Sequence, residues 1–442
     1  MPDAIGQRWT VVLDDDPTGT QGISGVPVVI PPSPETFRWA FARSDVIYVI
    51  TNTRALDRDT AEQLVRDTVK LAVEVASDLD GSARFISRGD STLRGHFPLE
   101  VQIVRDTSSE EYRGCLLVPA FPEAGRYTLD GTHYVTVKSV LRPVATTEYA
   151  RDATFGYDQS RLVQWAHARV PADWQVEELP SRIIDNGPAA VARFLADQSS
   201  CTLVCPSIRS KEDLAVLAEG QLLAERDGAS YLVQCAPSYV QHIGQLPAAR
   251  PANPTVRTST GLVVIGESHS HHHRPAHRIA RSSPDRRGGA RCPHPSGVGP
   301  RRRGRPGGQG STQQTDGEHG GAVHLAQRRH CEQSRRVAAH RGDRRCGTHR
   351  GHTADRAGTT KLRHRQGRHH LVVARALAWG AATIVGPLVD ATLPVWQGWR
   401  DDADDPVCVI FPGNVGKPNL LVRAVTRLGQ LHQESSGRTV PA

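Results

Sequence analysis

The sequence of 442 residues lacks any apolar run long enough to cross a membrane, and residues 1–10 lack the apolar core of a secretory signal. Its eight cysteines also lack the paired spacing of a metal site, and Cys201 and Cys205 lie in an apolar run typical of a buried strand. These absences argue against a membrane protein, a disulfide scaffold and a zinc module. We therefore expect a cytoplasmic protein with reduced, structural thiols and two or three domains.

Residues 267–370 lack aromatic side chains altogether. This stretch of 104 residues has no Phe, Trp or Tyr and only six Ile, Leu or Val, yet it carries 15 of the 20 histidines. It holds 22 Arg and one Lys against seven Asp or Glu, a balance of +16, so the chain's net charge of +8 leaves −8 for the remainder. Because so little apolar area cannot offset chain entropy, we predict that this segment is disordered as written.

Three interpretations account for this composition: an arginine-rich nucleic-acid arm, a histidine-rich metal-binding tract, or the wrong reading frame of a GC-rich gene. If one base of permissible codons is skipped, residues 267–278 become Ser-His-Thr-Arg-Thr-Thr-Thr-Gly-Gln-Leu-Thr, an ordinary loop and helix start. The same offset turns residues 366–370 into Lys-Gly-Gly-Ile-Thr, a glycine loop. Because both edges are abrupt and ordinary sequence lies on either side, we favour a pair of frameshifts.

Outside that segment, strand-like apolar runs repeatedly end in polar loops, which indicates a parallel sheet with helices. The predicted strands are 9–13, 46–50, 83–86, 115–118, 201–205, 231–234, 261–266 and 407–411. The predicted helices are 59–76, 214–227 and 418–431. We therefore predict an α/β fold of two domains, residues 1–246 and 247–442, each with a mainly parallel sheet flanked by helices. The second domain would be disrupted at 267–370.

The densest polar cluster is the stretch 88–100, which directly follows a strand-like run. Ligands bind at the carboxyl ends of strands in open α/β sheets. The cluster offers two arginines suited to a carboxylate or phosphate and three polar residues suited to sugar hydroxyls: Arg88, Arg94, Asp90, Ser91 and Thr92. The alternative is a plain strand-to-helix turn, with Asp90 or Ser91 as its N-cap and the arginines in solvent.

Other strand ends carry complementary charges. Three successive carboxylates, residues 14–16, follow the first strand and repel one another, so they need a cation, a donor-rich ligand or open water. Single arginines follow two further strands. Because the carboxyl ends of parallel strands share one sheet edge, we expect a cluster of Asp15, Asp16, Arg54, Asp90, Arg94 and Arg126.

The last predicted strand runs into a loop with the sequence Pro-Gly-Asn-Val-Gly-Lys at 412–417. Glycines at a strand-to-helix turn let backbone amides approach a phosphate group. A simple tight turn explains the same residues, and the spacing is not that of a Walker A loop.

Together, the stretches 15–19, 51–56, 90–95, 119–126 and 411–416 resemble the four-carbon acid sugar kinase family, which includes 3-oxo-tetronate and threonate kinases. The resemblance covers about residues 9–266 and 371–431. It implies an N-terminal domain that binds an acid sugar and a C-terminal domain that binds ATP. It also implies transfer of the γ-phosphate to a terminal hydroxyl of a four-carbon sugar acid.

The resemblance also implies roles for individual residues. Either Asp16 or Asp90 would orient the attacking hydroxyl or act as base. The substrate-binding set would be Asp15, Arg54, Arg88, Ser91, Thr92, Arg94 and Arg126. The nucleotide loop would contain Gly413, Asn414 and Gly416.

ATP and Mg²⁺ are the implied cofactors, with Mg²⁺ bridging the phosphates and no separate protein metal site. The implied partner is a small four-carbon sugar acid, with no specific nucleic acid and no membrane. Two other functions stay open. One is a sugar-acid-binding protein without catalysis, and the other is a nucleic-acid binder that uses the Arg-rich segment.

Overall fold

The computed structural model describes residues 7–108, 110–247, 249–252, 254, 263–265, 380–389, 393–398, 407–411 and 419–435. The segment 267–370 and the predicted nucleotide loop with Gly413, Asn414 and Gly416 lie outside the described residues. All described residues belong to one compact unit, which is formed by Met1–His273 and Thr360–Ala442.

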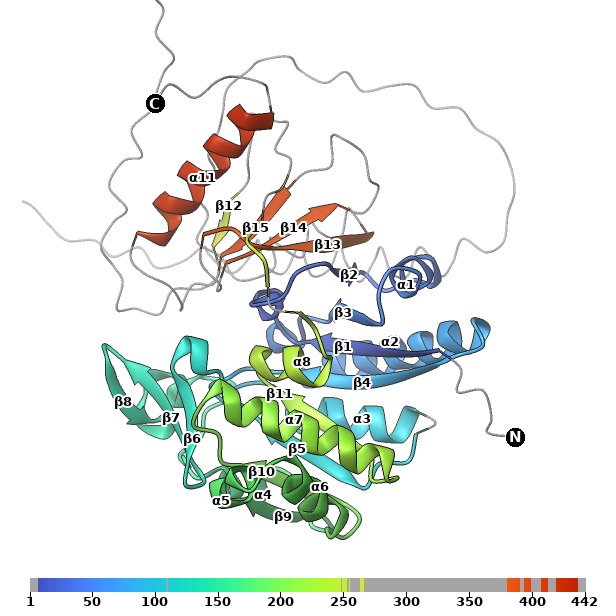
Figure 1. Ribbon diagram of the computed structural model, residues 1–442, viewed down its shortest axis with the longest axis vertical. Coiled ribbons are helices and arrows are strands. Elements are labelled where there is room, and N and C mark those ends of the chain that lie inside the picture. Colours follow the sequence, from blue (N-terminus) through green and yellow to red (C-terminus); the bar gives the residue numbers. More distant parts are fainter. Residues whose placement is uncertain are drawn as a thin grey trace, which may run out of the picture. The chain divides into compact units, whose positions relative to one another are not determined.

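Twelve strands of the described chain form one sheet, in the order β12-β15-β14-β13-β2-β3-β1-β4-β11-β5-β10-β9 (Figure 1). Their bounds are β1 (Arg8–Asp14), β2 (Val26–Ile30), β3 (Val46–Ile50), β4 (Ser82–Arg88), β5 (Gly114–Val118), β9 (Gln175–Leu179), β10 (Thr202–Pro206), β11 (Tyr231–Cys235), β12 (Val263–Ile265), β13 (Gly380–Pro387), β14 (Pro394–Gly398) and β15 (Val407–Phe411). All neighbours from β2 to β9 run parallel, whereas β13 pairs antiparallel with both β2 and β14. The predicted α/β fold with a mainly parallel sheet is confirmed.

Helices cover both faces of this sheet. Their bounds are α1 (Pro34–Phe41), α2 (Arg58–Asp78), α3 (Leu99–Thr107), α4 (Leu162–His167), α5 (Ser181–Asp185), α6 (Pro188–Ala196), α7 (Lys211–Arg226), α8 (Pro237–Ile243) and α11 (Leu420–Ser435). Side chains alternate along each strand, so Val11 and Leu13 pack with α1–α4 while Val12 packs with α5–α8. Figure 1 shows α7 and α8 in front of the strands. A strand buried on both faces explains the continuous apolar runs in the sequence.

Three further strands form a small antiparallel sheet: β6 (Arg126–Leu129), β7 (Thr132–Val137) and β8 (Val140–Pro143). The sequence pattern placed Arg126 among the polar residues that follow the strand 115–118. Arg126 is instead the first residue of β6, because the chain turns at Gly125, whose φ is +74°, and returns to pair with β7.

β2 and α1 are among the elements that the sequence pattern did not predict, so the strand predicted at 46–50 is the third along the chain and not the second. Both elements are short, and prolines at positions 27, 31, 32 and 34 weaken their periodic pattern. In contrast, α2 has a long apolar stripe and a clear start. The side chain of Asp57 caps it by accepting a hydrogen bond from the Thr60 amide at 2.9 Å.

Candidate functional site

Strand register brings the polar loops to one edge of the sheet. Asp14 at the end of β1 lies beside Ile50 of β3 on one side and Arg88 of β4 on the other. The three loops that follow these strands therefore leave the sheet at the same level. This is the edge at which ligands bind in parallel α/β sheets.

Arg54 is the centre of an ion-pair network at this edge. It lies in η2 (Thr53–Ala55), and its Nη2 and Nε contact the two carboxylate oxygens of Asp15 at 2.6 and 3.0 Å. Its Nη1 lies 3.2 Å from Asp16 Oδ2 and 3.7 Å from Asp90 Oδ1. One guanidinium therefore joins the acidic loop after β1 to the loop after β4, and the bidentate contact fixes its orientation.

Arg88 supplies a second internal cation. Its side chain is only 6% exposed, and its Nη1 lies 2.9 Å from Asp14 Oδ1 and 3.2 Å from Asp15 Oδ1. The successive carboxylates thus find the cation that their repulsion requires within the chain itself. These contacts of Arg88 neutralise the acidic loop. The predicted contact of Arg88 with the substrate stays a prediction.

Asp14 is fully buried behind the site. Burial raises its pKa to about 7 against the opposing effect of Arg88, and repulsion from Asp15 and Asp16 adds to the increase. Gly19 packs directly against the Asp14 carboxylate, because a Cβ at position 19 would lie 2.3 Å from the two carboxylate oxygens. Close packing therefore requires a glycine at position 19.

Asp90 is bonded within its own loop. Its Oδ2 accepts hydrogen bonds from Arg94 Nε at 2.8 Å and from the hydroxyl of Thr92. Burial opposes its ionisation, but Arg94 and Arg54 outweigh burial and hold its pKa well below the usual range. The alternative of an N-cap at Asp90 or Ser91 is wrong, since α3 begins only at Leu99 and its N-cap is Pro98.

Two residues that the sequence analysis missed hold this loop from outside. His133 of β7 is fully buried, and its Nε2 lies 2.8 Å from the Ser91 carbonyl oxygen while its Nδ1 lies 3.1 Å from Thr128 Oγ1. Tyr157 donates a hydrogen bond to the carbonyl oxygen of Thr92 at 2.6 Å. Nothing in the local sequence marks either residue, because each acts on a loop about 40 or more positions away.

Arg126 differs from the other arginines of the site. It is 5% exposed, its Nη1 donates to the Ala124 carbonyl oxygen, and its Nε has no hydrogen-bond partner among the described residues. No carboxylate in the described part of the chain forms an ion pair with it. Burial lowers its pKa, whereas the Tyr149 side chain, which forms a hydrogen bond with it, and the Asp90 carboxylate act in the opposite direction. A buried cation without a carboxylate partner is a favourable place for an anionic ligand.

Ser91, Thr92 and Arg94 complete the predicted set. Ser91 and Thr92 are buried, and the Thr92 hydroxyl is already bonded to Asp90. The Arg94 guanidinium lies 5.2 Å from the centre of the Tyr149 ring. The structure therefore brings together all the predicted residues of the acidic and arginine loops. Arg94 is paired with Asp90 and lies 3.9 Å from Asp152, so Arg126 is the arginine of the predicted set that has no carboxylate partner among the described residues.

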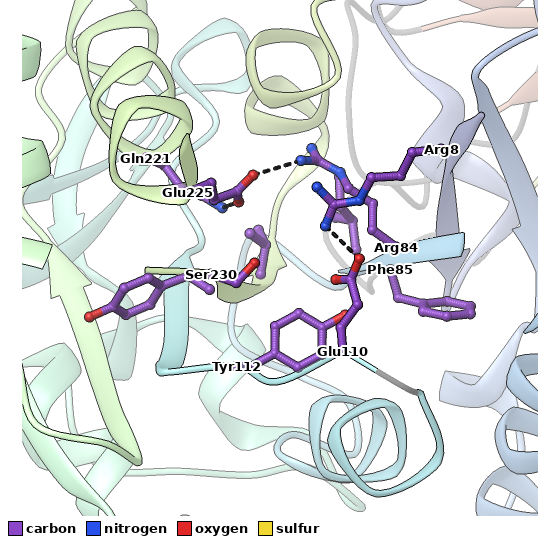
Figure 2. Close-up of a pocket in the computed structure, with 11 residues that line it drawn as sticks. Arg8, Arg84, Phe85, Glu110, Tyr112, Gln221, Glu225 and Ser230 are labelled. Carbon is purple, nitrogen blue, oxygen red and sulfur yellow. Dashed lines mark hydrogen bonds and ion pairs between the residues drawn. The ribbon is translucent and has the colours of Figure 1, made fainter. Parts of the chain in front are cut away.

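Figure 2 shows a separate cavity, which lies at the amino ends of the strands. Arg8 and Tyr231, the first residues of β1 and β11, contribute to its wall. Its charged groups are paired internally: Arg84 Nη1 lies 3.0 Å from Glu225, and Arg8 Nη2 lies 2.6 Å from Glu110. This cavity is at the edge opposite the acidic loops, so it is not part of the candidate site.

The described residues contain no group of three or more His, Cys, Asp or Glu side chains that could hold a metal ion. The carboxylates of the site face arginines instead. No helix within the described ranges combines the length and apolarity that a membrane crossing requires.

Comparison with known proteins agrees with the mixed α/β fold. A family model described as the sugar-binding N-terminal domain matches residues 10–243, more than half of the chain. The chain therefore belongs to the four-carbon acid sugar kinase family, of which this domain is the N-terminal part.

A curated relative, the D-threonate kinase of Bordetella bronchiseptica, is 30% identical over 158 residues. That alignment covers 36% of this chain and 37% of the relative, so the chain matches little more than a third of the relative's length.

Two crystal structures share the fold. A Salmonella typhimurium LT2 protein provisionally named a tRNA synthase has a TM-score of 0.55 at 14% identity, over 95% of this chain and 99% of that one. A Haemophilus influenzae protein of the DUF1537 family has a TM-score of 0.53 at 14% identity, over 94% and 99%. At this identity the likeness concerns the fold.

Proposed function

We propose that this protein is an ATP-dependent kinase that phosphorylates a terminal hydroxyl of a four-carbon acid sugar of the tetronate or threonate class. The observation that carries the proposal is the state of Arg126: a buried guanidinium with an unpartnered Nε beside Asp90 and Arg94. A substrate carboxylate would offset the buried charge of this guanidinium. Family membership and the D-threonate kinase relative support the same substrate class.

In this proposal the side chains at the carboxyl edge of the sheet have separate roles. Arg126 and Arg94 bind the substrate carboxylate, and Arg54 holds Asp15, Asp16 and Asp90 in place through the contacts described above. Asp90, whose pKa is held low, accepts a hydrogen bond from the attacking hydroxyl and orients it. A carboxylate with so low a pKa is a weak base, and Asp16, which also contacts Arg54, is the other candidate for proton removal.

ATP would supply the phosphoryl group, and Mg²⁺ would neutralise charge on the phosphates. Because the described carboxylates of the site are paired with arginines, we propose that the metal arrives with the nucleotide and not through a separate protein site. The nucleotide would bind in the C-terminal domain, residues 247–442, at the loop with Gly413, Asn414 and Gly416. Residues 1–246 would bind the sugar acid.

Sugar-acid binding without phosphoryl transfer is the second candidate. It is favoured by the extent of the family match, which ends at residue 243 and thus supports the sugar-binding part of the chain most directly. The two candidates share the anion site and differ in whether ATP is consumed.

The test uses the purified full chain with Mg²⁺-ATP and, separately, D-threonate, L-threonate and D-erythronate. ADP release that depends on the sugar acid, with a phosphomonoester product in the ³¹P NMR spectrum, is expected of the kinase. Binding measured by calorimetry without ADP release identifies the second candidate. Absence of both contradicts the two functions together.

The variant Arg126→Met tests the anion site within the same experiment. Loss of the cation should weaken sugar-acid binding by about tenfold or more, since charge-assisted hydrogen bonds contribute roughly 1.5–3 kcal/mol. The matched control is Arg161→Met, because Arg161 is half-exposed and pairs with Glu178 away from the acidic loops. Wild-type affinity in Arg126→Met would remove this residue from the site.

A further inference from the structure

Tyr149 contacts both arginines of the proposed anion site. It belongs to η5 (Glu148–Arg151), and only 7% of the residue is exposed. The guanidinium of Arg94 lies 5.2 Å from the centre of its ring. Its side chain also forms a hydrogen bond with Arg126, in which the phenolic oxygen accepts because a guanidinium can only donate. One aromatic side chain therefore contacts two cations.

These two arginines repel each other. Water screens the repulsion weakly, because Arg126 is buried and only 10% of the Arg94 side chain is exposed. The Asp90 carboxylate attracts Arg126 as well. In the described part of the chain, however, Asp90 forms its ion pairs with Arg94 and Arg54. Other contacts must therefore keep Arg126 apart from Asp90.

Two hydrogen bonds hold the Arg126 guanidinium in place. Its Nη1 donates to the Ala124 carbonyl oxygen, and it also donates to Tyr149 from a later part of the chain. The backbone contact is local and follows from the turn at Gly125. The bond to Tyr149 is the one that involves a side chain, and hydrogen bonds of a charged group are roughly twice as strong as neutral ones. Among the described residues, Tyr149 is therefore the side chain that orients Arg126.

We infer that Tyr149 is a positioning residue of the anion site. Its ring supports Arg94 on Asp90 and its hydroxyl keeps Arg126 apart from that carboxylate, so that the charge of Arg126 remains available to the carboxylate of the sugar acid. Tyr149 acts through the arginines and touches no reacting atom. This inference rests on the proposed function, because it concerns the residue that prepares the Arg126 site for the sugar acid.

The chain that follows Tyr149 is attached to the Asp90 loop. The Tyr157 amide donates to the Ala150 carbonyl oxygen at 3.0 Å, which closes the chain between them into a turn. The hydroxyl of Tyr157 donates to the Thr92 carbonyl oxygen at 2.6 Å. The segment 149–157 is thus bound to the same loop that carries Arg94. A site arranged before the ligand arrives loses less ordering entropy on binding.

The test is a double-mutant cycle, measured by calorimetric binding of D-threonate to the full-length protein without nucleotide. Tyr149→Phe keeps the ring and removes the acceptor, so it should weaken binding by about 3–10-fold, the effect of one hydrogen bond. In the Arg126→Met background the same substitution should change the affinity by less than about twofold, because its effect passes through Arg126. A purely structural role would give the same loss in both backgrounds.

Tyr231→Phe is the matched control. Tyr231 is also buried, and its hydroxyl donates to the Leu195 carbonyl oxygen at 2.8 Å, but it lies at the amino ends of the strands. This variant should bind D-threonate as tightly as the wild-type protein does.

A crystal structure of Tyr149→Phe provides a second readout, which does not require that Arg126→Met binds the ligand measurably. The Arg126 guanidinium should move to within about 4 Å of the Asp90 carboxylate, the distance of an ion pair. Wild-type affinity in Tyr149→Phe, an equal loss in both backgrounds or an unmoved Arg126 overturns the inference and leaves the proposed function intact. If no sugar acid binds to the wild-type protein, both are overturned.

Discussion

Arg88 and Arg126 show how little the residue type alone says about role. Both arginines follow predicted strands and both are buried to the same extent, with 5% of each residue exposed. Arg88 contacts two carboxylates of its own chain, whereas Arg126 contacts none among the described residues. The first stabilises the acidic loop and the second is proposed to bind the ligand. The difference lies in partners contributed by distant loops.

His133 is the residue for which pH provides a test. Burial lowers its pKa to about 4, so the folded protein holds it neutral under the Ser91 carbonyl. In the unfolded chain its pKa is about 6.5, and protonation therefore favours unfolding. Its contribution to the free energy of unfolding is complete above pH 6.5 and is lost as the pH falls through 4.

We predict that His133→Gln has a shallower decrease in stability between pH 7 and pH 4 than the wild-type protein. The variant lacks the contribution of His133 to the free energy of unfolding, which is on the order of 3 kcal/mol because the pKa of His133 is 6.5 in the unfolded chain and about 4 in the folded protein. Urea unfolding at a series of pH values measures it. His167→Gln, which changes an exposed histidine, is the control and should follow the wild-type curve. An unchanged slope in His133→Gln would show that this histidine does not titrate as argued.

At the scale of elements, the contact between α6 and α7 depends on one small residue. Gly220 lies within α7, and a Cβ there would be 2.5 Å from Val191 Cβ and 2.8 Å from the Pro188 carbonyl oxygen of α6. Glycine inside a helix costs about 1 kcal/mol relative to alanine. The close approach of the two helices explains why α7 tolerates that cost.

We predict opposite effects for two helical glycines. Gly220→Ala should destabilise the protein by about 1–3 kcal/mol, because the new methyl group overlaps α6. Gly429→Ala in α11 should stabilise it by about 0.5–1 kcal/mol, because no described atom lies within 4 Å of the added Cβ. Chemical denaturation of both variants beside the wild-type protein measures the difference. Equal changes of the same sign would contradict the helix contact.

At the scale of the whole molecule, the charge distribution separates residues 267–370 from the rest. That segment carries +16 and the remainder −8. We predict that resequencing the coding DNA from codon 260 to codon 375 will find a one-base change near codon 267 and its compensation near codon 370. The corrected chain would then contain the Ser-His-Thr-Arg loop and the Lys-Gly-Gly-Ile-Thr loop that the shifted frame gives at these two places. Confirmation of the sequence as written would exclude a sequencing error and leave a sugar-acid-binding protein as the stronger candidate.

The sequence by itself determined the α/β class, most of the strands and the family, because apolar periodicity and the residues that end each strand are local features. It also predicted which loops meet, since parallel strands deliver their ends to one edge. Only the tertiary structure decided how the charges pair, that Arg126 begins a strand, and that His133, Tyr149 and Tyr157 contact the Asp90 loop. These contacts with the loop join residues about 40 to 65 positions apart, and their geometry depends on strand register and helix packing that no local pattern encodes.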